Sequence, residues 1–141
     1  MYKDGVEGPI IGCIGIEIDQ IRTPNGRTLP DRGRGPVISN LAVAKAYRRK
    51  GLAEDLVRAA ENLARKEWGY QDFYLYVEKQ NVPAVRLYRK MGYSTLWDDD
   101  SARSLIPSSR GGLESVPTTL LCMKKSVNGV GGILERIFKQ V

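Results

Sequence analysis

The feature that most constrains this fold is a short basic segment with a glycine in it, set between two apolar stretches of different periodicity. The segment reads Arg48-Arg49-Lys50-Gly51-Leu52-Ala53. Residues 38–43 before it form an apolar run that predicts a β-strand. After Gly51, apolar residues recur with the spacing of one helical face, at Leu52, Leu56, Val57, Ala60, Leu63 and Ala64. A strand, a tight turn and a helix therefore follow one another.

The predicted turn has the properties of an anion site. The first N–H groups of a helix have no partner inside the helix, and the helix dipole adds positive potential there. Gly51 lacks a Cβ atom, so a ligand can approach its backbone closely. Together with the cationic side chains of Arg48, Arg49 and Lys50, these amides predict a site for a phosphate or a pyrophosphate. The alternative is a basic helix start that only meets solvent.

Length and composition favour one intracellular domain. The chain has 141 residues, of which 42% are hydrophobic and 27% charged, an ordinary globular balance. No apolar run is long enough to span a membrane, and the polar first residues are not a secretory signal. We therefore expect the cytoplasm or an organelle, including a plastid if a targeting segment is missing from the sequence. The net charge of +6 suggests an anionic partner.

The cysteine and histidine content excludes several kinds of chemistry. Cys13 and Cys122 both lie in apolar, strand-like runs, and we expect both to be reduced core residues. The chain has no histidine, which removes Ser-His and Cys-His catalysis and argues against a zinc site. We therefore expect no metal.

The remaining periodicities predict a mixed α/β layout. Further strands are expected at residues 10–18, 73–77, 93–97 and 118–123. The first helix should run to about Trp68, with Gly69 as a left-handed cap. A second helix should start at Asn81, with Pro83 in its first turn, and stop at Gly92.

Two loops and a tail complete the predicted organisation. Residues 19–36 are rich in Pro, Gly and Arg and predict a loop with a hairpin turn at Asn25-Gly26. Residues 98–117 are expected to form a polar loop. We expect one domain over residues 1–126 and an amphipathic tail over residues 127–141, with apolar side chains at Ile133, Leu134, Ile137, Phe138 and Val141.

Two motifs in the central half of the chain resemble those of the GNAT superfamily of acyl-CoA-dependent N-acetyltransferases. Arg48, Gly51 and Ala53 match the spacing of the family's phosphate turn. The second motif is matched by Asn81, Ala84, Leu87, Tyr88, Gly92 and Tyr93. The resemblance implies a GNAT-like mixed sheet with splayed central strands flanked by helices. It also implies an N-terminal strand and helices, which this sequence lacks. Either the chain is a truncated gene product, or another segment, such as the tail, forms the missing wall of the acceptor site.

The resemblance implies acetyl-CoA as the co-substrate and assigns residues to it. The pyrophosphate would accept from the backbone amides of Arg49, Lys50, Gly51, Leu52 and Ala53, while Arg48 and Lys50 add charge. The pantetheine arm would enter the gap between splayed strands and pair with the backbone of the segment Leu41-Ala42-Val43. Asn81 would lie near this arm, and its alternative role is that of a helix N-cap.

Tyr88 is the candidate catalytic residue that the resemblance implies. A general acid near the sulfur assists departure of the thiolate, and an unperturbed tyrosine is protonated at neutral pH. The alternative is a core aromatic residue, which is the role we expect for Tyr93. No general base can be assigned, because the sequence does not locate Glu17, Asp19, Glu78 or residues 98–100 relative to the expected active site. A water held by Ser39 and Asn40 is the other option.

The acceptor is left open among a protein N-terminus, a lysine and a small amine. An α-amine loses its proton more easily than a lysine side chain does, which slightly favours an N-terminus or a small amine. Two loops could meet the acceptor, one carrying Arg22, Arg27, Arg32 and Arg34 and the other carrying Asp98, Asp99 and Asp100.

The main functional prediction is an N-acetyltransferase that works by direct attack of an amine on acetyl-CoA. The alternative is a degenerate module that binds acyl-CoA as a regulatory ligand without turnover. Nucleic-acid binding is not favoured, because no aromatic and basic motif accompanies the positive charge. The sequence does not predict the oligomeric state.

Overall fold

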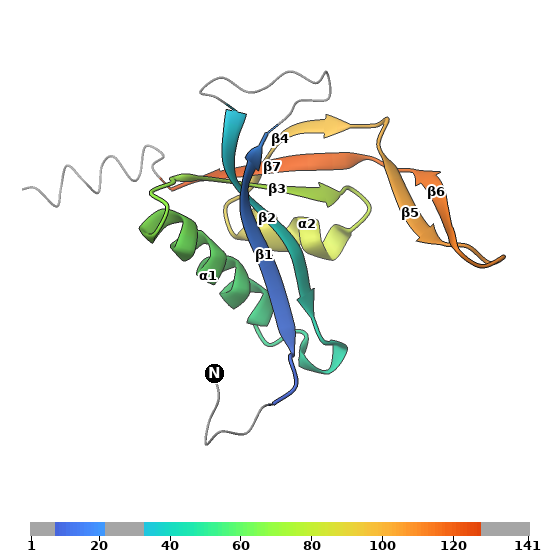
Figure 1. The fold of residues 1–141 in the computed structure, drawn as a ribbon, viewed down its shortest axis with the longest axis horizontal. Coiled ribbons are helices and arrows are strands. Elements are labelled where there is room, and N and C mark those ends of the chain that lie inside the picture. The colour runs from blue at the N-terminus through green and yellow to red at the C-terminus, as the bar shows by residue number, and fades with distance from the viewer. Residues whose placement is uncertain (1–7, 22–32, 128–141) are drawn as a thin grey trace, which may run out of the picture.

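The computed structural model describes residues 8–21 and 33–127, which form a five-stranded mixed sheet, two α-helices and a two-stranded hairpin (Figure 1). The strand order in the large sheet is β1-β2-β3-β7-β4. Its strands are β1 (Gly12–Gln20), β2 (Arg34–Val43), β3 (Asp72–Glu78), β4 (Ser94–Asp99) and β7 (Leu120–Ser126). β2 and β3 run parallel, whereas the other neighbours run antiparallel. The predicted mixed α/β sheet is confirmed.

Both helices pack against the same face of this sheet. α1 (Leu52–Lys66) and α2 (Val82–Lys90) share one buried cluster with the strands. Because side chains alternate along a strand, successive residues of β3 point to opposite faces. The helix-covered core contains Ile38, Val57, Ala60, Ala64, Phe73, Leu75, Val77, Val85, Tyr88, Tyr93, Leu121 and Met123. A smaller cluster on the other face contains Ile21, Val37, Tyr74 and Cys122. No helix in the described part of the chain has the length and apolarity that a bilayer crossing needs.

A buried polar group ties α1 to the sheet. The carboxylate of Glu61 accepts a hydrogen bond of 2.7 Å from the Tyr93 hydroxyl and one of 3.0 Å from Lys125 Nζ. Tyr93 is 3% exposed and belongs to the core, as expected. A buried carboxylate is tolerated only when it is paired in this way.

The central strands of the sheet separate as they approach the basic turn. β2 and β3 pair only at Val37–Tyr74 and Ile38–Leu75, although β2 continues to Val43. Beyond Ile38, Asn40 adopts a left-handed φ of 54° and the β1–β2 register shifts, which is a β-bulge. A bulge bends its strand, so β2 turns away from β3. The predicted splay of the central strands is confirmed.

The helix boundaries agree closely with their capping signals. α1 ends at Lys66, just before the predicted Trp68, and Gly69 has the expected left-handed φ of 72°. Asn81 caps α2, because its side chain accepts from the N–H of Ala84 at 3.4 Å. Strand β2 begins at Arg34 rather than at residue 38, because its pairing with β1 continues to the pair Gln20–Arg34.

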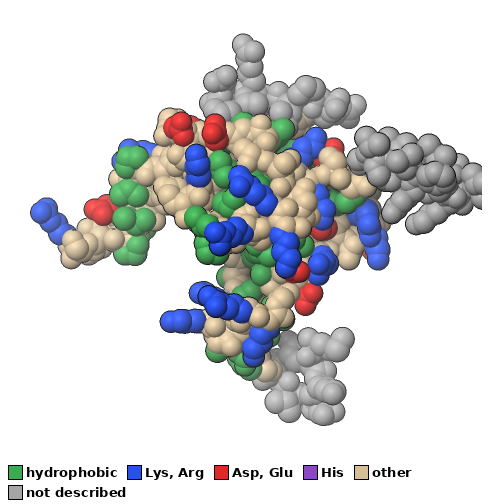
Figure 2. Space-filling model, turned by 180° about the vertical axis from the view of Figure 1, so that it is seen from behind, with side chains coloured by type: hydrophobic (Ala, Val, Ile, Leu, Met, Phe, Trp, Pro, Cys, Tyr) green, Lys and Arg blue, Asp and Glu red, His purple; other side chains and the backbone are tan. Residues whose placement is uncertain are grey.

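The prediction of a loop over residues 98–117 is wrong. This segment contains the end of β4 and a hairpin of β5 (Arg103–Pro107) and β6 (Leu113–Pro117). The Arg103 side chain crosses the hairpin and donates to Ser115 Oγ at 2.7 Å and to its carbonyl at 2.8 Å. The hairpin projects from the body (Figure 1), and apolar side chains gather on it in Figure 2. Its strands are short and have few buried side chains, so they lack the strong pattern of core strands.

The prediction that both cysteines lie in the core is wrong for Cys13. Cys122 is buried, but Cys13 is exposed because β1 lies at the edge of the sheet and no described helix covers the face to which Cys13 points. The predicted hairpin turn at Asn25-Gly26, the side chains of Arg22, Arg27 and Arg32, and the tail from residue 128 all lie outside the described residues.

Candidate functional site

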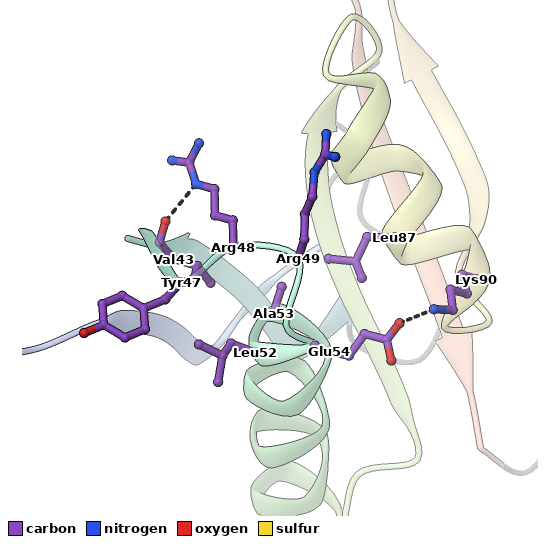
Figure 3. A pocket seen from close by; sticks show the side chains of 10 residues that line it. Val43, Tyr47, Arg48, Arg49, Leu52, Ala53, Glu54, Leu87 and Lys90 are labelled. Atoms are coloured by element: carbon purple, nitrogen blue, oxygen red, sulfur yellow. Dashed lines mark hydrogen bonds and ion pairs between the residues drawn. The ribbon is translucent and has the colours of Figure 1, made fainter. Parts of the chain in front are cut away.

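A cavity of about 420 Å³ opens between the β2–α1 turn and α2 (Figure 3). Its floor and walls come from the end of β2, the turn, the first turn of α1 and the last turn of α2. The lining residues are Val43, Tyr47, Arg48, Arg49, Gly51, Leu52, Ala53, Glu54, Leu87 and Lys90. The structure thus brings together six of the predicted cofactor residues: Val43, Arg48, Arg49, Gly51, Leu52 and Ala53.

The turn presents a run of unpaired backbone amides. Arg49 (φ 63°) and Gly51 (φ 79°) are both left-handed, and Gly51 is the N-cap of α1. The first amide of this helix with a backbone acceptor is that of Asp55, which donates to Gly51 at 3.1 Å. Within the described residues, the amides of residues 49–53 donate to no protein acceptor. Successive N–H groups around left-handed residues form an anion-binding concavity, and the helix dipole adds to it.

Gly51 itself is exposed, and a Cβ atom placed on it would meet nothing within 4 Å. No neighbouring atom would therefore clash with a larger residue at this position. The requirement for a glycine comes from the left-handed backbone, which costs roughly 1–2 kcal/mol for other residues. The turn is open toward solvent, as an anion site must be.

The basic side chains of the turn have different roles. Arg48 Nε donates to the Val43 carbonyl at 3.0 Å, which fixes the turn to the end of β2. Arg48 and Arg49 project from the turn at the cavity (Figure 3). Lys50 does not line the cavity, and its Nζ lies 5.5 Å from the centre of the Tyr47 ring. Figure 2 shows Lys and Arg side chains gathered at the projecting end of the molecule that carries this turn.

The end of β2 offers backbone groups to the gap between the splayed strands. The Ala44 N–H donates to the Ile11 carbonyl at 2.7 Å, so Ala44 turns its backbone toward β1. Alternation along the strand turns the N–H and C=O of Val43 away from β1. The C=O accepts from Arg48 Nε, which leaves the N–H for the gap. Ala42 pairs with Cys13 of β1, and Leu41 packs against the helix-covered core. Leu41 and Ala42 do not line the cavity.

An ion pair joins the two helices at the far wall of the cavity. Lys90 Nζ lies 2.6 Å from Glu54 Oε1 (Figure 3). Arg58 also contacts Glu54, at 3.3 Å. The hydrogen bond from Lys90 lowers the pKa of Glu54. The sequence prediction missed Tyr47, Glu54, Leu87 and Lys90 as lining residues. Glu54 and Lys90 are far apart in sequence, so no local pattern reveals this pair.

Asn81 and Tyr88 lie on α2 but do not line the cavity. Asn81 has the N-cap role that was its alternative. Tyr88 is 7% exposed and packs edge-on against Tyr93, with 5.9 Å between the ring centres. Burial raises the pKa of Tyr88, so its hydroxyl keeps its proton well above neutral pH. The cofactor-binding role of Asn81 and the cofactor-binding and catalytic roles of Tyr88 remain predictions.

The carboxylates proposed for the acceptor side have local structural partners. Asp99 Oδ1 accepts from the Ser101 hydroxyl at 2.6 Å and from its N–H at 2.9 Å, and these bonds lower the pKa of Asp99. Asp100 accepts from the Thr119 hydroxyl at 3.0 Å. At the bulge, Asn40 Nδ2 lies 3.5 Å from Ser39 Oγ. Among the described residues, no cluster of three or more metal-binding side chains occurs.

Comparison with known proteins identifies close similarities to acetyltransferases. The family model for the acetyltransferase (GNAT) family matches residues 1–93. The chain is 33% identical over 88 residues to an N-alpha-acetyltransferase of Saccharolobus solfataricus, a match covering 62% of this chain and 52% of that protein. It is 32% identical over 91 residues to GCN5-related N-acetyltransferase 4, chloroplastic, of Arabidopsis thaliana, covering 64% of this chain and 31% of that protein. The chain thus spans about half and about a third of these two relatives.

The fold is similar to that of Naa20 from Chaetomium thermophilum, whose crystal structure contains a bisubstrate analogue. The TM-score is 0.65 at 22% sequence identity, with 86% of this chain and 62% of that chain covered. At this identity the likeness concerns the fold alone.

Proposed function

The chain belongs to the acetyltransferase (GNAT) family, and we propose that it transfers an acetyl group from acetyl-CoA to an amine by direct attack. One observation carries the proposal: among the described residues the amides of residues 49–53 have no acceptor, and Arg49, Gly51, Leu52 and Ala53 of this turn line a cavity together with Arg48. Such an arrangement suits a pyrophosphate, because oriented amides, helix dipole and cations all favour negative charge there. The described residues show no histidine-activated nucleophile, which is consistent with attack by the amine itself.

Acetyl-CoA would supply an activated thioester, and this chain would bind and orient it. The pyrophosphate would accept from the amides of the turn. The pantetheine arm would follow the gap between β2 and β3, where Val43 offers its N–H. The bulge at Asn40 supports this path, because it separates the two strands just where the arm would enter. Leu52, Ala53 and Leu87 supply apolar surface on the cavity wall.

We propose Tyr88 as the general acid that protonates the departing thiolate. Its raised pKa keeps the proton in place at neutral pH. The amine would lose its proton to a water held by Ser39 and Asn40, whose side chains lie together at the bulge. Proton transfer of this kind contributes roughly 10²–10⁴-fold to a rate.

A protein N-terminus is the acceptor that we propose. The archaeal relative is named an N-alpha-acetyltransferase. The chemistry agrees, because part of an α-amine population with a pKa near 7.7–8.0 is already neutral near neutral pH, whereas a lysine with a pKa near 10.4 is almost fully protonated. The chloroplastic relative supports a plastid among the proposed compartments.

The experiment measures acetyl transfer by the purified chain. Release of the free thiol and mass spectrometry of the acceptor detect the reaction. Three acceptors are compared: a peptide with a free N-terminus, the same peptide with a blocked N-terminus and an internal lysine, and a small diamine. We expect acetylation of the free N-terminus. Binding of coenzyme A without thiol release on any acceptor would support the regulatory module instead. Failure to bind coenzyme A would overturn the proposal.

A further inference from the structure

Strand β1 has a glycine beside the bulge of β2. Gly15 stands directly opposite Ser39 in the β1–β2 pairing, and the register shift of the bulge lies between Cys13 and Gly15. A glycine inside a strand often marks a bulge or the close approach of another group. A Cβ atom placed on Gly15 would lie 3.0 Å from Ser39 Oγ and 3.7 Å from Asn40 Nδ2. The missing Cβ atom therefore makes room for these two side chains.

Ser39 and Asn40 lie over Gly15 on the face of the sheet opposite the helices. Ile38 belongs to the helix-covered core, whereas Val37 belongs to the cluster on the other face. Because side chains alternate along a strand, Ser39 points to the same face as Val37. The left-handed φ of Asn40 (54°) interrupts this alternation and keeps its side chain beside Ser39. Bulges are common next to active sites, where they redirect a side chain in this way.

Strand β1 also holds the backbone of the bulge. The Cys13 thiol donates to the Asn40 carbonyl at 3.5 Å. A left-handed residue persists only where its surroundings impose that conformation, and such residues are common at functional sites. The Asn40 side chain donates from Nδ2 to Ser39 Oγ at 3.5 Å. This bond orients the amide, so that Oδ1, at the other corner of the group, can accept from a water.

The bulge lies where β2 and β3 stop pairing. The last pair of these two strands is Ile38–Leu75, one residue before Ser39. A pantetheine arm that runs along the gap from Val43 toward Ile38 ends beside Ser39 and Asn40. The two polar side chains therefore stand where the thioester would meet the amine.

We propose that Gly15 is a positioning residue for removal of the proton from the amine. It acts through Ser39 and Asn40, which hold the proposed water, rather than through contact with either substrate. This inference rests on the proposed function. In the step concerned, an N–H bond of the bound ammonium breaks, its electron pair stays on nitrogen, and the proton passes to the water and on to solvent. A Cβ atom on Gly15 would displace Ser39 Oγ and with it the water.

The variant that tests this role is G15A. Gly15 does not have a left-handed φ, so alanine fits its backbone. We expect G15A to lower kcat/KM for a peptide N-terminus about tenfold at about pH 7 and to leave the dissociation constant of coenzyme A unchanged. The loss should shrink to about twofold or less at about pH 9, because an α-amine with a pKa of about 7.7–8.0 is then mostly neutral. A purely structural effect would lower kcat/KM by the same factor at every pH.

G35A is the matched control. Gly35 lies in the same pair of strands, and a Cβ atom placed on it would meet the Tyr74 ring at 2.9 Å. The crowding is similar to that at Gly15, but it occurs away from the bulge. We expect G35A to lower stability in urea and to leave the pH dependence of kcat/KM unchanged.

S39A tests the route by which Gly15 acts. It removes the hydroxyl group that an added Cβ atom would displace, so G15A should lower kcat/KM less than about twofold in an S39A background. A full loss in that background, a loss that does not depend on pH, or a G15A chain equal to the wild type at about pH 7 would overturn the role of Gly15 alone. Absence of turnover in the wild-type chain would instead overturn the proposed function, and the role of Gly15 with it.

Discussion

At the scale of single residues, Gly51 determines the backbone conformation of the proposed anion site. Its φ of 79° is left-handed, which strains any residue with a β-branched side chain. We expect G51V to distort the amide array and to lower the affinity for coenzyme A about tenfold or more, as measured by calorimetry.

Gly69 is a matched control for this change. It is left-handed (φ 72°), also has open space around it, and lies beyond the other end of α1. G69V should cost similar stability and leave the affinity unchanged. Equal loss of affinity in both variants would show that Gly51 acts through stability alone.

Tyr88 is both a buried core residue and the proposed general acid. Its hydroxyl is the one atom that Y88F removes. If Tyr88 is the general acid, we expect Y88F to lower kcat about 10²-fold or more and to leave the dissociation constant of coenzyme A unchanged. Pre-steady-state thiol release would measure the chemical step.

Y93F is the control for Y88F, because the two rings are neighbours in one core. It removes the hydrogen bond to Glu61 and should lower stability by about 1–3 kcal/mol without loss of kcat. Retention of full activity in Y88F would leave Tyr88 as a core aromatic residue.

At the scale of elements, the Glu54–Lys90 ion pair couples the start of α1 to the end of α2 across the cavity. Lys90 neutralises a carboxylate that stands beside the proposed pyrophosphate site. We expect K90M to weaken coenzyme A binding about 2–5-fold, the range of an exposed pair, and the effect to shrink at high salt.

The double variant separates this effect from a direct contact. E54Q combined with K90M should restore most of the affinity, since the unpaired carboxylate is gone. An equal loss in K90M and in the double variant would mean that Lys90 itself contacts the ligand. A double-mutant cycle by calorimetry makes this comparison.

At the scale of the whole molecule, the buried thiol and phenol groups determine how the free energy of unfolding changes at alkaline pH. Burial raises the pKa of the Cys122 thiol from 9.0 to about 12, and it also raises the pKa of Tyr88 and Tyr93. The folded chain therefore keeps protons that the unfolded chain releases. The free energy of unfolding should be constant up to about pH 9 and then fall, by about 1.4 kcal/mol per pH unit for each such group.

Urea unfolding at several pH values, followed by tryptophan fluorescence, measures this slope. C122A removes one of the groups, so the decline just above pH 9 should become less steep even if the variant is less stable throughout. A slope that C122A does not change would contradict the assignment of Cys122.

What the sequence determined by itself is local in origin. The capping role of Asn81, the left-handed Gly69, and the strand, turn and helix around Arg48 and Gly51 follow from residues within a few positions of one another. Backbone conformation there depends on missing Cβ atoms, capping oxygens and helical periodicity, all of which can be read along the chain. The turn that we propose to bind an anion was therefore predictable.

What only the tertiary structure decided depends on contacts between distant residues. The exposure of Cys13 follows from the edge position of β1, and the wall formed by Glu54 and Lys90 exists because α1 and α2 cover the same face. The β5–β6 hairpin lacks a buried face and so lacks a strong pattern. Burial, edges and long-range ion pairs are set by which elements become neighbours, and that arrangement is not encoded in any single stretch of sequence.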